Sequence, residues 1–244
     1  MRFVDSHLHL DGPDATDTVA WAKSAGVAVF GCGTDERNSK SLLILAHGLD
    51  GTVFPFVGVH PSEAEKSEGL SWLPEAAKEA AGIGEIGLDP TYSPAGEGSP
   101  QMRAFRGQLE VAEKWGKPVQ VHSRSAEAKC LEVLGQSRVK RVLMHRLESE
   151  EAVPKAMERG YFVSFGPALL YSRRVQRAAM KSLPELTLLE TDSPVPYAPL
   201  GGAKGPALVP SVAFRLAELR GAPFGETLEG CSNNALRFLG GGKG

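Results

Sequence analysis

Two histidines lie two residues apart near the start of the chain, in the run Phe3-Val4-Asp5-Ser6-His7-Leu8-His9. In a β-strand, the side chains of residues i and i+2 point to the same face. His7 and His9 would therefore direct two imidazoles at one point, where they could chelate a divalent cation. Ordinary hydrogen bonding of both histidines is the alternative, so the remaining candidate ligands decide between the two interpretations.

Further acidic and histidine side chains follow other short apolar runs, where strands are expected to end. Five of the six histidines occupy such positions, and only His47 falls in an expected helix. The full set comprises His7, His9, His60, Glu85, Asp89, His122, His145 and Asp192. Glu85 lies inside an apolar strand, where an unpaired carboxylate is costly. It must therefore bind a cation or be well paired.

Three of the acidic residues also have structural interpretations. Asp192 precedes Ser193-Pro194 and could cap a helix or form a turn, and Asp89 could form an Asx-turn before Pro90. Glu190 would share a face with Asp192 if the strand continued that far, and we interpret it as structural.

Short β-branched runs alternate with helical patterns along nearly the whole sequence. We expect strands at residues 2–6, 27–31, 52–59, 83–88, 119–122, 139–144, 161–164 and 186–190. The expected helices span residues 16–25, 36–48, 72–81, 101–115, 126–134, 150–159 and 173–182, with two further C-terminal helices at 209–220 and 225–239. Eight such units predict one α/β domain over residues 1–244, a (β/α)8 TIM barrel with extra C-terminal helices. An open doubly wound sheet is the alternative, but the glycine-rich dinucleotide fingerprint is missing after the first strand.

In a (β/α)8 barrel the active site lies where the strands end, so the candidate side chains would converge there. Histidine, glutamate and aspartate together suit a pair of divalent ions such as Mg, Mn, Zn or Co. Glu85 is the natural bridge, because a carboxylate has two oxygens to share. Two ions about 3.5–4 Å apart can activate a water molecule and clamp an in-line displacement. That chemistry fits hydrolysis, most naturally of a phosphodiester.

Composition restricts the class of protein. The chain has 244 residues, of which 42% are hydrophobic and 23% charged, and its net charge is −2. No global positive field indicates a nucleic-acid partner, although a local basic rim stays open. Three widely spaced cysteines predict no disulfide framework. With no signal pattern and no apolar run of membrane-spanning length, we expect a cytoplasmic protein without membrane contact.

Several motifs resemble those of the TatD-like metal-dependent hydrolases, a branch of the amidohydrolase-type barrels. The resemblance covers nearly the whole chain. It is carried by Asp5-Ser6-His7-Leu8-His9, Gly58-Val59-His60-Pro61, Gly84-Glu85-Ile86-Gly87-Leu88-Asp89, Pro118-Val119-Gln120-Val121-His122-Ser123-Arg124, Ser164-Phe165-Gly166, Glu190-Thr191-Asp192-Ser193-Pro194 and Asn234-Ala235-Leu236-Arg237-Phe238. The segments at 84–89 and 190–194 are the most specific.

This resemblance implies a role for each matching residue. One metal ion would be held by His7, His9, Glu85 and Asp192, and the other by Glu85, His122 and His145. Asp192 would also orient or deprotonate the attacking water, and His60 and Arg124 would contact the scissile phosphate. The catalytic set would thus be Asp192, Glu85 and His60. The family likeness implies a two-metal deoxyribonuclease acting on DNA, as a single strand or at its ends.

Other outcomes remain open from the sequence. Arg124 could be a solvated charge, and Arg173 and Arg174 could line the catalytic rim or simply begin a helix. Tyr92, Tyr171 and Tyr197 could stack on bases or pack against loops. The segments 146–149 and 90–98 depart from the family pattern. A hydrolase of a small amide, lactone or ester is the second hypothesis, and a non-catalytic binding protein is the third. The sequence does not indicate the oligomeric state.

Overall fold

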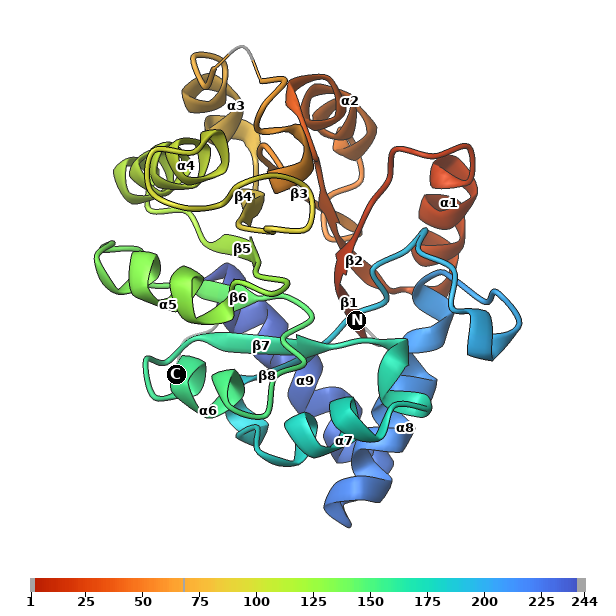
Figure 1. Cartoon of the computed structure of the whole chain (residues 1–244). Helices are drawn as coiled ribbons and strands as arrows, with labels where there is room; N and C mark the ends of the chain where they lie inside the picture. The colour runs from red at the N-terminus through yellow and green to blue at the C-terminus, as the bar shows by residue number, and fades with distance from the viewer. Residues whose placement is uncertain (1–2, 68, 241–244) are drawn as a thin grey trace.

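Eight parallel strands follow one another in sequence order around a nearly closed barrel, and helices cover its outside (Figure 1). The computed structural model describes residues 3–67 and 69–240. The strands are β1 (Val4–Leu8), β2 (Ala28–Cys32), β3 (Val53–Val57), β4 (Gly82–Gly87), β5 (Val119–His122), β6 (Val142–Met144), β7 (Phe162–Phe165) and β8 (Thr187–Leu189). The predicted TIM barrel is confirmed.

Nine helices are present in the described part of the chain, each where the sequence pattern predicts one. They are α1 (Ala15–Ala25), α2 (Glu36–Ala46), α3 (Leu73–Glu79), α4 (Pro100–Trp115), α5 (Glu127–Gly135), α6 (Ala152–Met157), α7 (Arg173–Met180), α8 (Val209–Arg220) and α9 (Phe224–Leu239). Their ends differ from the predicted ends by at most a few residues.

Helix α4 illustrates why these segments are helical. The Ser99 hydroxyl accepts a hydrogen bond from the Met102 backbone N–H at 3.1 Å, which caps the first turn. Gly116 ends the helix in the left-handed conformation at φ 61°, as C-terminal glycines commonly do. Between these ends, apolar side chains at helical spacing, such as Phe105 and Leu109, are buried against the barrel.

Strand β1 differs most from its predicted position. The pattern placed a strand at residues 2–6, of which residue 2 lies outside the described part of the chain. The strand instead runs on to Leu8, because Leu8 still pairs with Gly31 of β2 after a register shift that follows Asp5. His7 therefore lies within the strand instead of after it.

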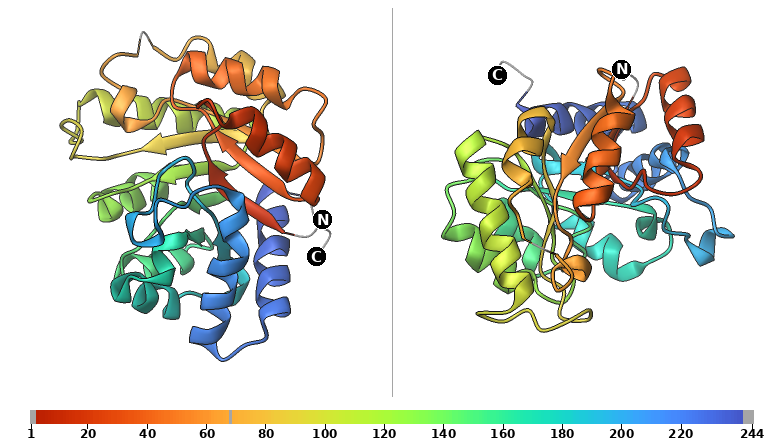
Figure 2. Two further views of the ribbon diagram at one scale, coloured as in Figure 1. Left: turned by 90° about the vertical axis from the view of Figure 1, so that its right-hand side faces the viewer. Right: turned by 90° about the horizontal axis from the view of Figure 1, so that it is seen from above.

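Helix α9 packs across the end of the barrel at which the strands begin (Figure 2). Its Phe238 is fully buried and stacks on Phe56 of β3, with ring centroids 5.8 Å apart and nearly parallel planes. Phe30 of β2 and Phe162 of β7 complete an aromatic cluster around the same ring. Side chains of the strands and of α9 thus fill the lower half of the barrel, which leaves the other end for polar groups.

Strands β8 and β1 meet at a seam that is held by polar contacts. The Ser6 hydroxyl donates to the Leu189 carbonyl at 2.9 Å, and the Asp5 carboxylate accepts from the backbone N–H of Thr191 at 2.9 Å. Beyond β8, the Asp192 N–H donates to the carbonyl of His7 at 2.9 Å. The seam therefore joins the first and last strands at the level where candidate ligands lie.

The expected absence of a disulfide framework agrees with the structure, in which Cys32, Cys130 and Cys231 are all buried free thiols. In residues 3–67 and 69–240, no helix combines the length and the apolar character needed to cross a membrane.

Candidate active site

A cavity of about 710 Å³ opens at the carboxyl ends of the strands. Four of the predicted histidines line it, together with Glu85 and Asp192, and three arginines surround its mouth. Val195 and Tyr92 are the only lining residues of the described chain whose side chains are mainly apolar. The cavity is therefore polar, unlike a closed apolar pocket for a small neutral molecule.

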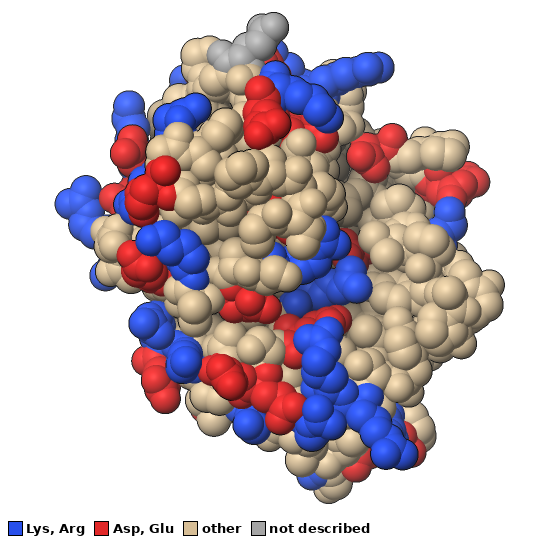
Figure 3. Space-filling model, in the orientation of Figure 1, with Lys and Arg blue, Asp and Glu red and all other residues tan. Residues whose placement is uncertain are grey.

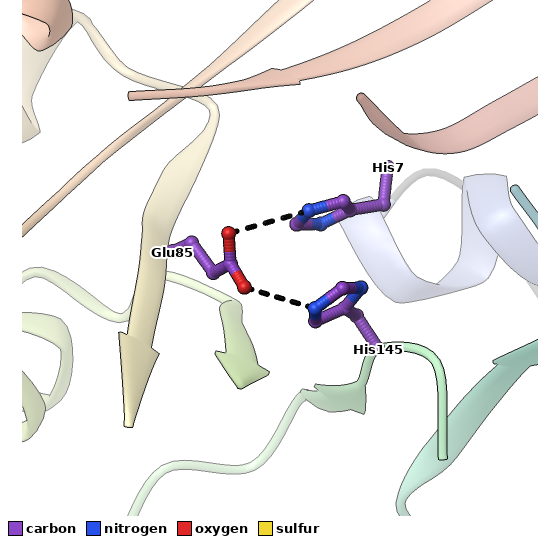
Figure 4. A group of neighbouring side chains, drawn as sticks. All are labelled: His7, Glu85 and His145. Carbon is purple, nitrogen blue, oxygen red and sulfur yellow. Dashed lines mark ion pairs between the residues drawn. The ribbon is translucent and has the colours of Figure 1, made fainter. Parts of the chain in front are cut away.

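The two carboxylate oxygens of Glu85 face two different groups of histidines. Its Oε2 lies 3.5 Å from Nε2 of His7 and 3.3 Å from Nε2 of His9. Its Oε1 lies 2.9 Å from Nε2 of His145 and 2.7 Å from Nδ1 of His122. Figure 4 shows His7 and His145 approaching opposite oxygens of this carboxylate. Such an arrangement suits a carboxylate that bridges two cations.

Asp192 completes the first group, since its Oδ1 lies 3.8 Å from Nε2 of His7 and 3.7 Å from Nε2 of His9. We refer to the six side chains His7, His9, Glu85, His122, His145 and Asp192 as the ligand cradle. They are contributed by β1, β4, β5 and the segments after β1, β6 and β8, so the barrel alone brings them together. All six were predicted to converge.

Close contact between β4 and β5 brings Glu85 and His122 within reach of each other. At Gly87, where φ is 136°, an added Cβ would lie 2.0 Å from the carbonyl oxygen of His122. Only glycine tolerates both this conformation and this approach.

Three cradle histidines are oriented by a partner at the second ring nitrogen. Nδ1 of His7 donates to Oε1 of Gln120 at 2.6 Å, and Nδ1 of His9 donates to the Cys32 carbonyl at 3.0 Å. Nδ1 of His145 lies 3.4 Å from Oε1 of Glu190. These contacts leave Nε2 of each ring directed at Glu85 as a possible ligand atom.

Asp89 combines two roles on the other side of the cavity. Its Oδ1 accepts from the Thr91 N–H at 2.9 Å, which is an Asx-turn. Its Oδ2 accepts from Nε2 of His122 at 2.8 Å and from Nε of Arg124 at 2.9 Å. Arg124 also covers the ring of Tyr92, with 5.1 Å between the guanidinium carbon and the ring centroid. The Arg124 guanidinium is thus held at the mouth of the cavity.

His60 follows β3 and differs from the cradle histidines in its hydrogen bonding. Its Nδ1 accepts from the Ser62 backbone N–H at 3.1 Å, so the ring proton lies on Nε2. That Nε2 points toward the cradle, where it lies 3.3 Å from Nδ1 of His122 and 3.6 Å from Oε1 of Glu85. Burial lowers the pKa of His60 to about 4, so the ring is neutral. His60 therefore offers a neutral N–H donor toward the cavity.

Arg146 contacts the oxygen of Asp192 that faces away from the cradle. Its Nη1 lies 2.7 Å from Oδ2 of Asp192, and its Nε lies 3.4 Å from Oε1 of Glu148. Arg146 and Asp192 both adopt left-handed backbone conformations, at φ 47° and 53°. Such a conformation costs a residue other than glycine about 1–3 kcal/mol and is concentrated at functional sites.

The electrostatics of the cradle fit divalent cations. Burial alone would raise the pKa of Glu85, but the imidazoles of His60, His145 and His7, which are charged at the low pH where Glu85 titrates, hold that pKa well below its usual range. Burial alone would lower the pKa of His145, but Glu85 and Glu190 raise it well above its usual value. Nε2 of His7 is buried without a hydrogen-bond partner among the described residues. A cation between these groups would satisfy that nitrogen and displace the protons.

Three side chains that surround the cradle were not predicted as functional. Gln120 interrupts an apolar strand two residues before His122, and that interruption was a usable signal. Glu190, which we interpreted as structural, is fully buried between His145 and the hydroxyl of Ser164. The contact between Arg146 and Asp192 could not be predicted from the sequence, in which the one indication was that segment 146–149 departs from the family pattern.

Comparison with known proteins identifies the family. A family model described as TatD related DNase matches residues 4–240. Human deoxyribonuclease TATDN3 is 30% identical, with 97% of this chain and 94% of the human protein covered. The uncharacterized metal-dependent hydrolase YcfH of Escherichia coli K12 is also 30% identical, with 98% and 96% covered. The chain belongs to the TatD related DNase family.

A crystal structure of the TatD homologue YjjV from Escherichia coli K12 has the same architecture. It superimposes with a TM-score of 0.86 at 26% identity and covers 97% of each chain. The resemblance drawn from the motifs is therefore confirmed over the length of the barrel. So is the prediction that this TatD family member is a metal-dependent hydrolase.

Proposed function

We propose that this TatD family protein is a two-metal phosphodiesterase that acts on DNA. The observation that carries the proposal is the carboxylate of Glu85, whose two oxygens face two separate groups of ligand atoms. One ion belongs with His7, His9 and Asp192, and the other with His122 and His145. Mg, Mn, Zn and Co all suit these ligands. When bound, two such ions supply an activated water and neutralise charge on the reacting phosphate.

The chain's own groups surround the reacting phosphate with donors. The N–H at Nε2 of His60 and the Arg124 guanidinium would bind its non-bridging oxygens. Asp192 would orient the attacking water through Oδ1 and accept its proton, while Arg146 holds the other oxygen. Tyr92, half exposed beside His60 and Arg124, offers a ring for a base of a single strand or a frayed end.

The names of the relatives support DNA as the substrate. The similar human protein is described as a deoxyribonuclease, and the matching family model carries the same activity in its description. The polar cavity and the arginines at its mouth fit a polyanion better than a small amide, lactone or ester.

The test is cleavage of labelled single-stranded and duplex DNA by protein loaded with Mg, Mn, Co or Zn. We expect metal-dependent cleavage that Glu85→Ala and His122→Ala reduce at least about 100-fold. His47→Ala is the matched control, because His47 is exposed at the end of α2, and it should leave activity unchanged. Absence of cleavage by protein that holds two ions, with turnover of a lactone or amide instead, would replace the proposal by the second hypothesis.

A further inference from the structure

Arginines lie on both sides of the cradle, but their surroundings differ. Arg124 follows β5, and the carboxylates of Asp89 and Glu127 lie on the same side of the cavity. Arg146 follows β6, the strand next to β5, and Arg174 belongs to α7, farther round the barrel beyond β7 in Figure 1. In Figure 3, basic side chains gather around the central hollow and continue over the region of α7.

A row of alternating charges leads from the cradle to the surface near β6 and α7. Arg146 contacts Asp192 at 2.7 Å and Glu148 at 3.4 Å. Arg174 donates to Oε2 of Glu148 at 2.7 Å and to its carbonyl oxygen at 3.0 Å. Glu148 thus fixes both guanidinium groups through one carboxylate. Its side chain is 15% exposed, whereas that of Arg174 is 60% exposed.

Arg146 and Arg174 keep hydrogen-bond donors that are free to bind a further group. Arg146, Arg174 and Glu148 together carry one net positive charge, and Asp192, which contacts Arg146, is shared with the cradle. Nη2 of Arg146 has no hydrogen-bond partner among residues 3–67 and 69–240, and Arg174 faces solvent. Fork-shaped donors held in this way suit a phosphate group.

From this arrangement we infer that Arg146 and Arg174 bind a second phosphate of the substrate, next to the one that is cleaved. The inference rests on the proposed phosphodiesterase activity and names the substrate class more narrowly. His60 and Arg124 already serve the scissile phosphate from the β3–β5 half, so the β6–β8 half is left for its neighbour. A preferred substrate carries either a terminal phosphate or a further phosphodiester at that position.

The test compares small substrates that differ only in their phosphates. Thymidylyl-thymidine contains one phosphodiester, and its 5′-phosphorylated, 3′-phosphorylated and one-nucleotide-longer forms contain a second phosphate. We expect kcat/KM to be about tenfold higher for at least one of the forms with two phosphates. A terminal form identifies a DNA end as the source of the second phosphate, and the longer form identifies a continuous strand.

Variants then assign the preference to the arginines. Arg174→Ala should lower kcat/KM about tenfold more for the preferred form than for thymidylyl-thymidine. Arg174→Lys should restore part of the difference. Arg146→Gly should also reduce the preference, and it should fold because glycine suits the left-handed backbone at this position. Arg177→Ala is the matched control on α7, where Arg177 pairs with Glu150 and does not line the cavity.

A binding measurement provides a readout that does not depend on turnover. We expect Arg174→Ala to reduce the slope of log affinity against log salt by about 0.7 for a short single strand. The inference would be overturned if Arg174→Ala lowered kcat/KM equally for all substrates, or if it changed neither the salt slope nor the substrate preference. Cleavage of thymidylyl-thymidine would still support the phosphodiesterase proposal in either case. Failure of every form to be cleaved would remove the phosphodiesterase proposal, and an unchanged salt slope would then remove the phosphate site as well.

Discussion

Glu85 is the residue on which the geometry of the centre depends, because its two carboxylate oxygens face the two groups of ligands separately. Its neighbours approach within 2.7 to 3.6 Å of one oxygen or the other. Gln120, Glu190 and the Cys32 carbonyl hold the surrounding imidazoles in the orientation that this carboxylate requires. At this scale, function depends on which atom of each ring faces inward.

Replacing Glu85 with glutamine should separate bridging from simple ligation. The amide keeps one carbonyl oxygen of similar shape but no longer offers two anionic oxygens. We expect metal analysis to find two ions per chain in the parent protein and at most one in Glu85→Gln. The exposed His47→Ala variant should still bind two ions. Two ions bound by Glu85→Gln with unchanged affinity would contradict the bridging role.

Replacing Gln120 with leucine should weaken the metal centre without removing a ligand. Oε1 of Gln120 accepts a hydrogen bond from the Nδ1–H of His7, which favours the tautomer whose Nε2 is free to bind a metal ion. Loss of such a partner typically lowers metal affinity by about 10–100-fold. Titration with Zn or Mn should reveal this change. Gln176→Leu, on α7, should have no effect, and equal affinities for the two variants would refute the orienting role.

Residue types and spacing were sufficient to predict that the six cradle side chains converge, since parallel strands end at one edge of the barrel; their role as metal ligands stays a prediction. The surroundings of the cradle were harder to predict. Arg146 contacts Asp192 from a left-handed backbone conformation, and neither that conformation nor the partner leaves a local pattern in the sequence. Glu190 lies just past the end of β8, so the face to which it points could not be deduced from alternation.

At the scale of elements, α9 completes a barrel whose strands alone would leave one end open. Phe238 projects from this helix into the aromatic cluster formed by Phe30, Phe56 and Phe162. The helix itself was predictable from its apolar spacing. Its place beneath the barrel was not, because a sequence pattern indicates which face of a helix is buried but does not indicate the partner.

Truncating Phe238 to alanine should destabilise the protein by about 3–5 kcal/mol, because it empties a fully buried site. The measurement is denaturant unfolding followed by circular dichroism. Phe224→Ala in the same helix removes a ring that is 40% exposed and should cost less than about 1 kcal/mol. A similar decrease in the free energy of unfolding for the two variants would mean that α9 does not stabilise the protein by filling the end of the barrel.

At the scale of the whole molecule, the cradle joins both halves of the barrel, so we expect metal binding and folding to be coupled. Its ligands range from His7 at the first strand to Asp192 beyond the last. Buried carboxylates and imidazoles without a cation must be stabilised by shared protons, as the raised pKa of His145 indicates. Ions that bind only the folded chain therefore add to its stability.

Removing the metal with a chelator should lower the melting temperature by about 5–10 °C. The estimate counts one site only: about 2.7 kcal/mol for an ion present at about 100 times its dissociation constant, with about 2–4 °C for each kcal/mol, and a second ion would add a similar shift. Differential scanning calorimetry with and without a chelator measures the shift. Glu85→Ala should show no response to the chelator. If the parent protein melts at the same temperature with and without the chelator, metal binding does not contribute to the stability of the fold.

The seam between β8 and β1 has a consequence for synthesis in the cell. The carbonyl of His7 accepts a hydrogen bond from the backbone N–H of Asp192, and both residues belong to the same group of predicted ligands. A nascent polypeptide on the ribosome presents His7 and His9 early, yet it lacks their acidic partner until most of the barrel has been translated. We therefore expect the complete group of ligands, and with it ion binding, to form only when the barrel closes.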